Sequence, residues 1–443
     1  MSSEFLTLYR FADLLSEPLR NGIYKTKEHH GRGVKVVNMG ELFGHPRLRD
    51  VPMKRLELTE GELRKSSLRE GDLLFARRSL VAAGAGKCTI VKEIAEPTTF
   101  ESSIIRARPN ESLADSDYIY YFFSSPQGRE LMGTILRQVA VSGITGGDLA
   151  ELKIPLPNLN VQHRQASVLQ ALDDRITLLR ETNTTLEAIA QALFKSWFVD
   201  FDPVHAKMQG RAPEGMDDAT AALFPDNFEE SELGAVPKGW QVMPIGDAVE
   251  TVGGATPDTK TPEYWEPAEH HWTTPKDLSG IASPVLLSTE RKLSNAGIKK
   301  ISSGLLPVGS LLMSSRAPIG YLALAQTPMA INQGYIAMPP GGKLSPLYML
   351  FWCQTNMDNI KGRANGSTFM EISKKAFRPI PALVAPQSIL DPFDEVARSL
   401  FSLLVENEKQ AQTLSALRDT LLPRLISGQL QLPEAVKLEE ALE

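Results

Sequence analysis

Cysteine is scarce in this chain of 443 residues, and long uncharged apolar stretches are missing from it. The two cysteines, Cys88 and Cys353, lie far apart and outside any metal-ligand spacing, which excludes a disulfide framework and most zinc modules. A membrane helix needs about 18 consecutive apolar residues, whereas the first twenty residues already contain Glu, Asp and Arg. We therefore expect a globular protein of a reducing cytoplasm, neither secreted nor membrane-spanning.

A surplus of positive charge, which would favour a nucleic-acid binder, is also missing, because the net charge is −6. The charge is unevenly distributed, however. Residues 1–150 carry +2 and residues 236–385 carry +4, whereas residues 151–235 carry −7 and residues 386–443 carry −5. Two mildly basic blocks thus alternate with two acidic segments, a pattern that is compatible with DNA binding but does not establish it.

What the chain does contain is an internal repeat. The sequence GDLLFARR (71–78) returns as GSLLMSSR (309–316), which places Arg78 opposite Arg316. On each side of this motif we match further pairs of segments in the same order: Glu41 with Asp277, SGIT (142–145) with NGST (365–368), and Gln162 with Gln387. The chain is therefore one unit written twice, a mixed block of short strands and helices followed by a long helix.

Each copy ends in a helix with a heptad pattern. In residues 161–198 the leucines are seven apart, and in residues 387–427 leucines again occupy one heptad row, with Leu403 and Leu417 on the next row. The row in residues 161–198 comprises Leu172, Leu179, Leu186 and Leu193. The main row in residues 387–427 comprises Leu400, Leu414 and Leu421. Since each seam is too long for its own block to cover, we expect the two helices to form an antiparallel coiled coil.

These features predict an α+β fold with two pseudo-repeated domains joined by two long helices. The expected segments are a first domain (1–157), a central long helix (158–200), a locally packed linker (201–235), a second domain (236–385), a C-terminal long helix (386–430) and a tail (431–443). Two similar blocks joined by a rigid element suit two similar targets at a fixed separation.

Motifs for chemistry are weak. The phosphate-loop mimic AAGAGKCT (82–89) lacks the first glycine and the Ser or Thr for magnesium, and MPPG (338–341) is no methyltransferase tetrad. A nuclease site from Pro257-Asp258 and Glu290-Arg-Lys292 would occur in one copy only. Three functions stay open on these grounds: a DNA-reading scaffold without catalytic residues, a stand-alone nuclease or methyltransferase, and a duplicated adaptor that binds only proteins.

Taken together, FKSWFVDFDPV (194–204), PKGW (237–240) and the GDLLFARR type of strand resemble the specificity subunit of type I restriction–modification enzymes, over essentially the whole chain. The resemblance implies two target recognition domains that each read half of a bipartite DNA site. It implies that the helices set the spacer and dock modification subunits, two of them, that carry S-adenosylmethionine. Restriction subunits, which use ATP and Mg²⁺, would join outside them. This chain would hold no cofactor or metal and would be non-catalytic.

The candidate DNA contacts follow from side-chain chemistry. An arginine after a short strand can bind a guanine edge or a phosphate with its planar fork, which makes Arg77, Arg78 and Arg316 the leading candidates, although each could instead be ion-paired. Lys35 and Lys276, in another matched loop, are expected on phosphate. Small polar loops could approach DNA or merely cap the next helix; their residues are Ser142, Thr145, Asn365, Ser367 and Thr368.

The end of the central helix carries the aromatics Trp197 and Phe198, which are expected to bind a partner or to pack inside the protein. The two matched histidine pairs, His29-His30 and His270-His271, lack further metal ligands nearby, and we expect them on the surface. Because the two blocks differ in their variable stretches, the expected DNA site is asymmetric.

Overall fold

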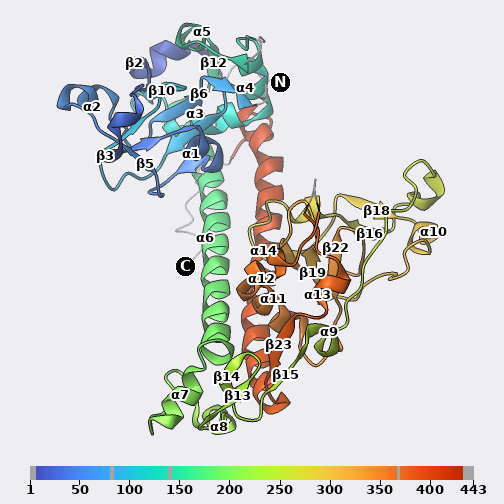
Figure 1. The fold of residues 1–443 in the computed structure, drawn as a ribbon. Helices are drawn as coiled ribbons and strands as arrows, with labels where there is room; N and C mark the ends of the chain where they lie inside the picture. Colours follow the sequence, from blue (N-terminus) through green and yellow to red (C-terminus); the bar gives the residue numbers. More distant parts are fainter. Residues whose placement is uncertain (1–5, 80–83, 138–141, 367–369, 433–443) are drawn as a thin grey trace, which may run out of the picture. The chain divides into compact units, whose positions relative to one another are not determined.

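The computed structural model describes residues 6–79, 84–137, 142–366 and 370–432. The chain forms two compact units, one made of residues 1–175 and 413–443 and the other of residues 176–412. Both units mix short strands with helices, which confirms the α+β class (Figure 1). Ser367 and Thr368, two of the candidate DNA contacts, lie outside the described residues.

The first unit is built on a five-stranded sheet of order β2–β10–β6–β8–β4, whose strands span Leu15–Asn21, Ile104–Pro109, Leu73–Ala76, Cys88–Val91 and Arg47–Leu48. A three-stranded sheet holds β5 (Lys54–Leu56), β3 (His30–Val37) and β9 (Thr98–Phe100), and two-stranded pairs join β1 (Thr7–Arg10) to β12 (Lys153–Leu156) and β7 (Arg78–Ser79) to β11 (Ser142–Gly143). The α-helices are α1 (Met39–Gly44), α2 (Glu60–Ser66), α3 (Ser116–Ser124), α4 (Pro126–Gly133) and α5 (Gly146–Ala150), and 3-10 helices are η2 (Phe11–Leu14) and η3 (Lys27–His29).

Strand β6 lies in the middle of this sheet because every residue of it is apolar and fully buried. Its Phe75 ring packs edge-on against Phe11 of η2 and Phe123 of α3, with ring centroids 5.9 and 5.0 Å away. Such aromatic pairs add to the free energy gained by burying their area. The LLFA part of GDLLFARR is therefore core, and the arginines that follow it lead toward solvent.

The second unit repeats this plan. A four-stranded sheet has the order β17–β20–β19–β22, with strands Val285–Leu286, Leu322–Ala325, Leu311–Ser314 and Tyr335–Met338. A three-stranded sheet holds β18 (Arg291–Leu293), β16 (His270–Thr273) and β21 (Met329–Ile331), and pairs join β15 (Gln241–Pro244) to β23 (Pro381–Val384) and β13 (Phe228–Ser231) to β14 (Gly234–Pro237). Its helices are α7 (Asp202–Met208), α8 (Asp218–Leu223), α9 (Ile245–Ala248), η5 (Pro262–Tyr264), η6 (Pro275–Leu278), α10 (Asn295–Ile298), α11 (Pro346–Thr355), α12 (Met357–Gly362) and α13 (Lys374–Phe377).

The duplication is visible in the strand connections. Strand β6 lies between β8 and β10, as β19 lies between β20 and β22, and both three-stranded sheets have one antiparallel and one parallel pairing. The match of Glu41 with Asp277 is confirmed, because both close a capping box at the start of a short helix. The Glu41 carboxylate accepts from the Asn38 amide at 2.8 Å, and the Asp277 carboxylate accepts from the Thr274 amide at 2.7 Å.

The long helices α6 (Leu159–Phe198) and α14 (Gln387–Ile426) are each 40 residues long. They run antiparallel and side by side (Figure 1), with Leu186 packed against Leu404 and Val405. The expected coiled coil is confirmed. The second row of leucines on α14 is not part of its seam, however, because Leu403 is 49% and Leu417 is 45% exposed. The buried positions of α14 follow a heptad of their own, Ala397, Leu404, Ala411 and Leu425, and the row of Leu400, Leu414 and Leu421 lies half-buried beside them.

The equal lengths of α6 and α14 correct one sequence match. Gln387 begins α14 as Leu159 begins α6, so Gln387 corresponds to Leu159 rather than to Gln162. The preceding strands agree with this correspondence, because β12 is separated from α6 by as many residues as β23 is from α14. The glutamine match was misleading because a glutamine occurs in the first turn of each helix, LNVQ in α6 and QSIL in α14, but at different positions.

The linker does not pack only locally, which corrects another expectation. Its Phe224 ring packs on Trp197 at 5.3 Å between centroids, and Trp240, just beyond the linker at the start of the second domain, packs on Phe198 at 5.8 Å. All four side chains are buried in the core of the second unit. The acidic, proline-rich composition of the linker hid its anchor Phe224.

Among the described helices, none combines the length and the low charge that a membrane crossing requires.

Candidate nucleic-acid interface

In the first block, the chain continues straight past the buried end of β6. The Arg77 amide donates to the Ser103 carbonyl at 2.8 Å, and the Arg77 carbonyl accepts from the Ile144 amide at 3.0 Å. Arg78 then forms β7 and pairs with Gly143 of β11, with its side chain exposed. No ion pair of Arg78 occurs within the described part of the chain. The backbone therefore fixes the position of Arg78 and leaves its guanidinium open to a ligand.

The second block holds Arg316 in the same backbone frame. The Ile372 amide donates to the Ser315 carbonyl at 3.0 Å, just as that of Ile144 donates to Arg77, and Arg316 then bridges to Glu371 as Arg78 pairs with Gly143. The structure thus brings Arg78 and Arg316 to equivalent places, as the sequence predicted. Arg316 differs in its neighbour, because its Nη1 lies 3.6 Å from the Glu371 carboxylate and its side chain is 36% exposed.

Of the two adjacent arginines of the first block, Arg77 is less accessible to a ligand than Arg78. Its side chain is half-buried, and Nη1 lies 3.4 Å from the Ser102 carbonyl, a long hydrogen bond. Its counterpart in the second block is Ser315, which is buried. The repeat therefore supports Arg78 as the exposed contact more strongly than Arg77.

The polar loops correspond differently from the sequence match. SGIT (142–145) corresponds to residues 370–373 and not to NGST, because Thr145 is the N-cap residue of α5 as Ser373 is that of α13. The Thr145 hydroxyl accepts from the Asp148 amide at 3.1 Å, and that of Ser373 accepts from the Ala376 amide at 3.2 Å. Thr145 is thus a helix cap, the alternative that its sequence left open. Short loops of Ser, Thr and Gly look alike, so the hydroxyl pattern alone could not fix the match.

Ser142 and Asn365 occupy different surroundings. Ser142 lies in β11 opposite Ser79 and is only 9% exposed, so its hydroxyl is not presented to solvent. Asn365 is exposed and exchanges two backbone hydrogen bonds of 3.0 Å with Glu371, beside Arg316. Asn365 therefore lies close to the candidate arginine of its block, whereas Ser142 contributes backbone only.

Arg137 is a basic residue that the sequence reasoning missed. It exchanges backbone hydrogen bonds with Gly143, the residue opposite Arg78, and so takes the place that Asn365 has in the second block. Its side chain is 64% exposed, and Nη2 lies 2.7 Å from the Asp148 carboxylate. The Thr145 hydroxyl and then the Arg137 guanidinium hold the pKa of Asp148 below its usual value. Because Arg137 is placed by an isolated backbone pairing with Gly143 and by no regular strand or helix, no periodicity signalled it.

The two candidate lysines are both ion-paired. Lys35 is only 12% exposed and contacts Asp50 at 2.6 Å and Glu96 at 3.2 Å, which neutralises its charge and disfavours a phosphate contact. Lys276 is 77% exposed and pairs with Glu290 at 2.9 Å, an exposed pair that a phosphate could replace at small cost. Of the two, Lys276 is the better placed for DNA.

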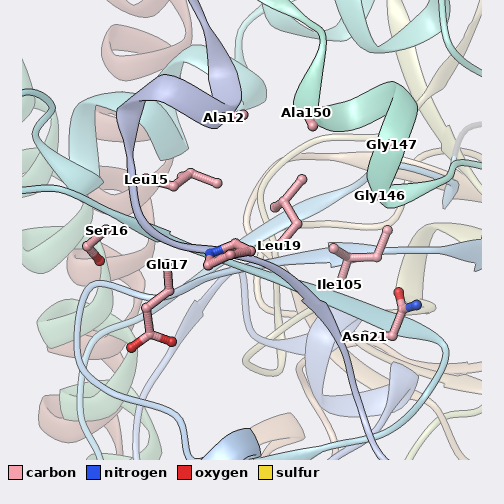
Figure 2. Close-up of a pocket in the computed structure, with 11 residues that line it drawn as sticks. Ala12, Leu15, Ser16, Glu17, Leu19, Asn21, Ile105, Gly146, Gly147 and Ala150 are labelled. Carbon is pink, nitrogen blue, oxygen red and sulfur yellow. The ribbon is translucent and has the colours of Figure 1, made fainter.

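A hollow of about 530 Å³ lies elsewhere in the first block, between η2, β2, β10 and α5 (Figure 2). Its charged lining residue is Glu17, whose carboxylate binds Arg106 and Arg108 at 2.6 Å each. Because both arginines bind this carboxylate, the described lining offers no unpaired positive charge to a phosphate, and nothing in it favours a part in the candidate interface.

No cluster of His, Cys, Asp or Glu that could hold a metal occurs in the described residues. The matched histidines bond instead to their neighbours. His270 Nε2 lies 2.9 Å from the Asn295 amide oxygen, and His271 Nδ1 lies 3.0 Å from the Thr289 hydroxyl. Burial, together with nearby Lys292, lowers the pKa of His271. Both thiols are buried, which raises the pKa of Cys88 and of Cys353.

The helix residues that were expected to meet a partner face inward or flank the seam. Leu179 and Leu186 are buried, and the remaining seam leucines (Leu172, Leu193, Leu400, Leu414 and Leu421) are half-buried. Trp197 and Phe198 are 6% and 7% exposed within the core of the second unit. These two aromatics therefore pack inside the protein, which is the second of the two roles that the sequence allowed.

Comparison with known proteins gives a consistent result. Residues 16–188 and 237–411 match the model of the type I restriction modification DNA specificity domain. The chain is 25% identical, over 83% of its length and 88% of the relative, to the type I restriction enzyme HindI specificity subunit of Haemophilus influenzae. It is 36% identical to the MjaIX specificity subunit of Methanocaldococcus jannaschii, over 41% of this chain and 42% of that protein.

A solved structure shares the fold. The S subunit of a type I restriction–modification system from M. genitalium superimposes with a TM-score of 0.58 at 17% identity, over 96% of this chain and 97% of that one. The likeness extends over both blocks and both helices.

Proposed function

Because this chain belongs to the type I restriction modification DNA specificity family and is a DNA-binding specificity subunit, we propose that its two blocks read two different halves of one DNA site. Residues 1–157 and 236–385 are the two recognition domains. The observation that carries the proposal is the equivalent placement of Arg78 and Arg316 at the solvent end of a buried strand. The family assignment disfavours the nuclease, methyltransferase and adaptor alternatives.

The chemistry of the two arginine sites supports two different readings. Arginine binds the guanine edge through two parallel hydrogen bonds in the major groove, or binds phosphate. Arg78 has Arg137 beside it, whereas Arg316 has Asn365 and the Glu371 carboxylate. An asparagine prefers adenine and a carboxylate accepts from cytosine, so the two blocks present different hydrogen-bonding groups. An asymmetric bipartite site follows.

The charge of the chain supports dependence on partners. The net charge of −6 gives the chain little overall attraction for DNA. Its modification subunits therefore supply many of the contacts to the DNA phosphates. In this proposal S-adenosylmethionine resides in two modification subunits, and ATP and Mg²⁺ in restriction subunits. The chain itself contributes recognition without catalysis, in the cytoplasm.

The long helices have the features of a spacer and a docking surface. Between them they leave several large apolar side chains exposed beside the buried seam: Leu178, Ile189, Val396, Leu403 and Leu417. An apolar row along a helix suits a helical partner that lays its own apolar face against it. The helices (158–200 and 386–430) would thus dock the modification subunits and hold the two readers at one spacing.

Methylome sequencing tests this function. Cells that express this chain with its cognate modification subunit are compared with cells that lack only this chain. The expected result is a new methylated motif of two short defined parts, different from one another and separated by a fixed run of unspecified bases. If the complex assembles and no new motif arises, the chain does not read DNA.

A further inference from the structure

Two buried asparagines interrupt the apolar seam between α6 and α14. Asn183 is 3% and Asn407 is 7% exposed. The Asn407 Nδ2 donates to the Asn183 Oδ1 at 2.9 Å, and the Asn183 Nδ2 donates to the Leu404 carbonyl at 3.1 Å. One hydrogen bond thus joins the two amides, and the amide group of Asn183 finds a second partner in the backbone of α14.

This pair breaks the internal symmetry of the chain. Asn407 is the twenty-first residue of α14, and the twenty-first residue of α6 is Leu179. Asn183 is the twenty-fifth residue of α6, and the twenty-fifth residue of α14 is Ala411. In the antiparallel arrangement Leu179 and Ala411, both buried, lie opposite one another one turn from the asparagines. The seam thus has one amide layer and one equivalent apolar layer.

The asymmetry matters because α6 and α14 are the two copies of one repeated helix. In the same geometry, two copies of α6 could pair with each other, and so could two copies of α14. Asn183 would then face Leu179 of the second copy, and Asn407 would face Ala411. Each like-with-like pair would bury two asparagines that lack the Asn–Asn hydrogen bond, and a buried polar atom left without its partner shifts such an equilibrium by roughly tenfold or more.

We propose that the Asn183–Asn407 hydrogen bond selects the pairing of α6 with α14 over the pairing of either helix with its own kind in a second copy. A polar residue at a single seam position is an effective way to specify register and partner. The two helices share their length and leucine pattern, so the leucines alone discriminate poorly between these pairings. This role is independent of which DNA is read.

The test uses the full chain with a protease site in the exposed loop at 210–215, between α7 and α8. The folded chain is cleaved, so that the two halves are no longer tethered and are held by their contacts. Two preparations, with different affinity tags on the N-terminal half, are mixed, unfolded in urea and refolded. Native mass spectrometry and capture through one tag then count like-with-like pairs.

The wild-type halves are expected to refold into unlike pairs. Asn183→Leu combined with Asn407→Leu removes both amides and should raise the share of like pairs at least about tenfold. Leu179→Asn combined with Ala411→Asn should also raise it, because every pairing then matches an amide with an amide. This second variant loses selectivity without removing either native asparagine, so the test does not depend on the first variant folding.

A matched control moves the amide layer instead of removing it. The changes Asn183→Ala and Asn407→Leu, together with Leu179→Asn and Ala411→Asn, exchange the two layers and should restore unlike pairing. The proposal is overturned if the variants with no amide or with four amides pair as selectively as the wild type. It is equally overturned if the exchanged variant loses its selectivity.

Discussion

Asp173 of α6 and Arg418 of α14 form a half-buried ion pair of 2.7 Å, and the second Asp173 oxygen accepts from the Tyr121 hydroxyl of α3 at 2.7 Å. One carboxylate thus joins the first block to both long helices within the first unit. A carboxylate that is 8% exposed is costly to bury unless both of its oxygens have partners.

Asp173→Asn should therefore destabilise the protein by about 2–4 kcal/mol, because it leaves a charged guanidinium without its buried partner. Urea denaturation followed by circular dichroism measures the loss. The matched control is Asp419→Asn, since Asp419 also binds Arg418 at 2.7 Å but is 64% exposed. The control should cost less than about 0.5 kcal/mol, and an equal loss in both variants would contradict this account.

The buried Asp394 predicts a pH dependence. Burial raises the pKa of this α14 carboxyl above its usual value, although the Ser345 hydroxyl donates to it at 2.6 Å. A raised pKa means that the folded state holds the proton more tightly than the unfolded state does. The penalty for the ionised form is thus complete above the folded pKa and disappears below about pH 3.9, the unfolded value.

Asp394→Asn should accordingly raise the free energy of unfolding at neutral pH, because the amide oxygen still accepts from Ser345 without the buried charge. The gain over the wild type should shrink as the pH falls toward 4. Thermal unfolding from pH 4 to pH 8 measures it. Destabilisation by the amide at neutral pH would show that the charge is needed.

Leu403 tests the docking surface on the helices. Leu403→Asp should weaken binding of the modification subunit at least about tenfold, because it places a charge in an apolar contact. Calorimetry with the purified modification subunit measures the affinity. Leu113→Asp is the control, since Leu113 is similarly exposed at 47% but lies in a loop of the first block. Unchanged affinity for the Leu403 variant would remove this face from the docking surface.

The length of the helices tests their role as spacer. One heptad inserted into both α6 and α14 adds about 10 Å, since an α-helix rises 1.5 Å per residue. With about 3.4 Å per base pair, the run of unspecified bases should lengthen by about three. Methylome sequencing of the variant reads the spacer directly. An unchanged spacer would mean that another part of the complex sets the distance.

The sequence predicted the duplicated plan because its strongest signals are periodic. Apolar strands such as Leu73–Ala76 and two long heptad helices are set by burial, which the residue pattern records. The short polar connections were predicted less well. SGIT was matched with NGST because small hydroxyl residues recur in such loops, whereas the structure aligns it with the segment that ends at the cap Ser373.

The partners of individual charged side chains could not be predicted from the sequence either. Nothing in the pattern around Lys35 indicates that Asp50 and Glu96 would fold against it. Arg137 was missed because its position beside Arg78 arises from pairing across residues distant in the chain. Both cases depend on tertiary neighbours that no local spacing encodes.

The most direct test of two separate readers is methylome sequencing of Arg78→Ala and Arg316→Ala, each with its modification subunit. Each substitution removes one planar fork and should relax recognition by about 1–3 kcal/mol at one base pair. Arg32→Ala is the control, an exposed arginine of the first block that pairs with Glu57. The account predicts that Arg78→Ala degrades one half of the methylated motif and Arg316→Ala the other. Equal loss in both halves from either variant would contradict it.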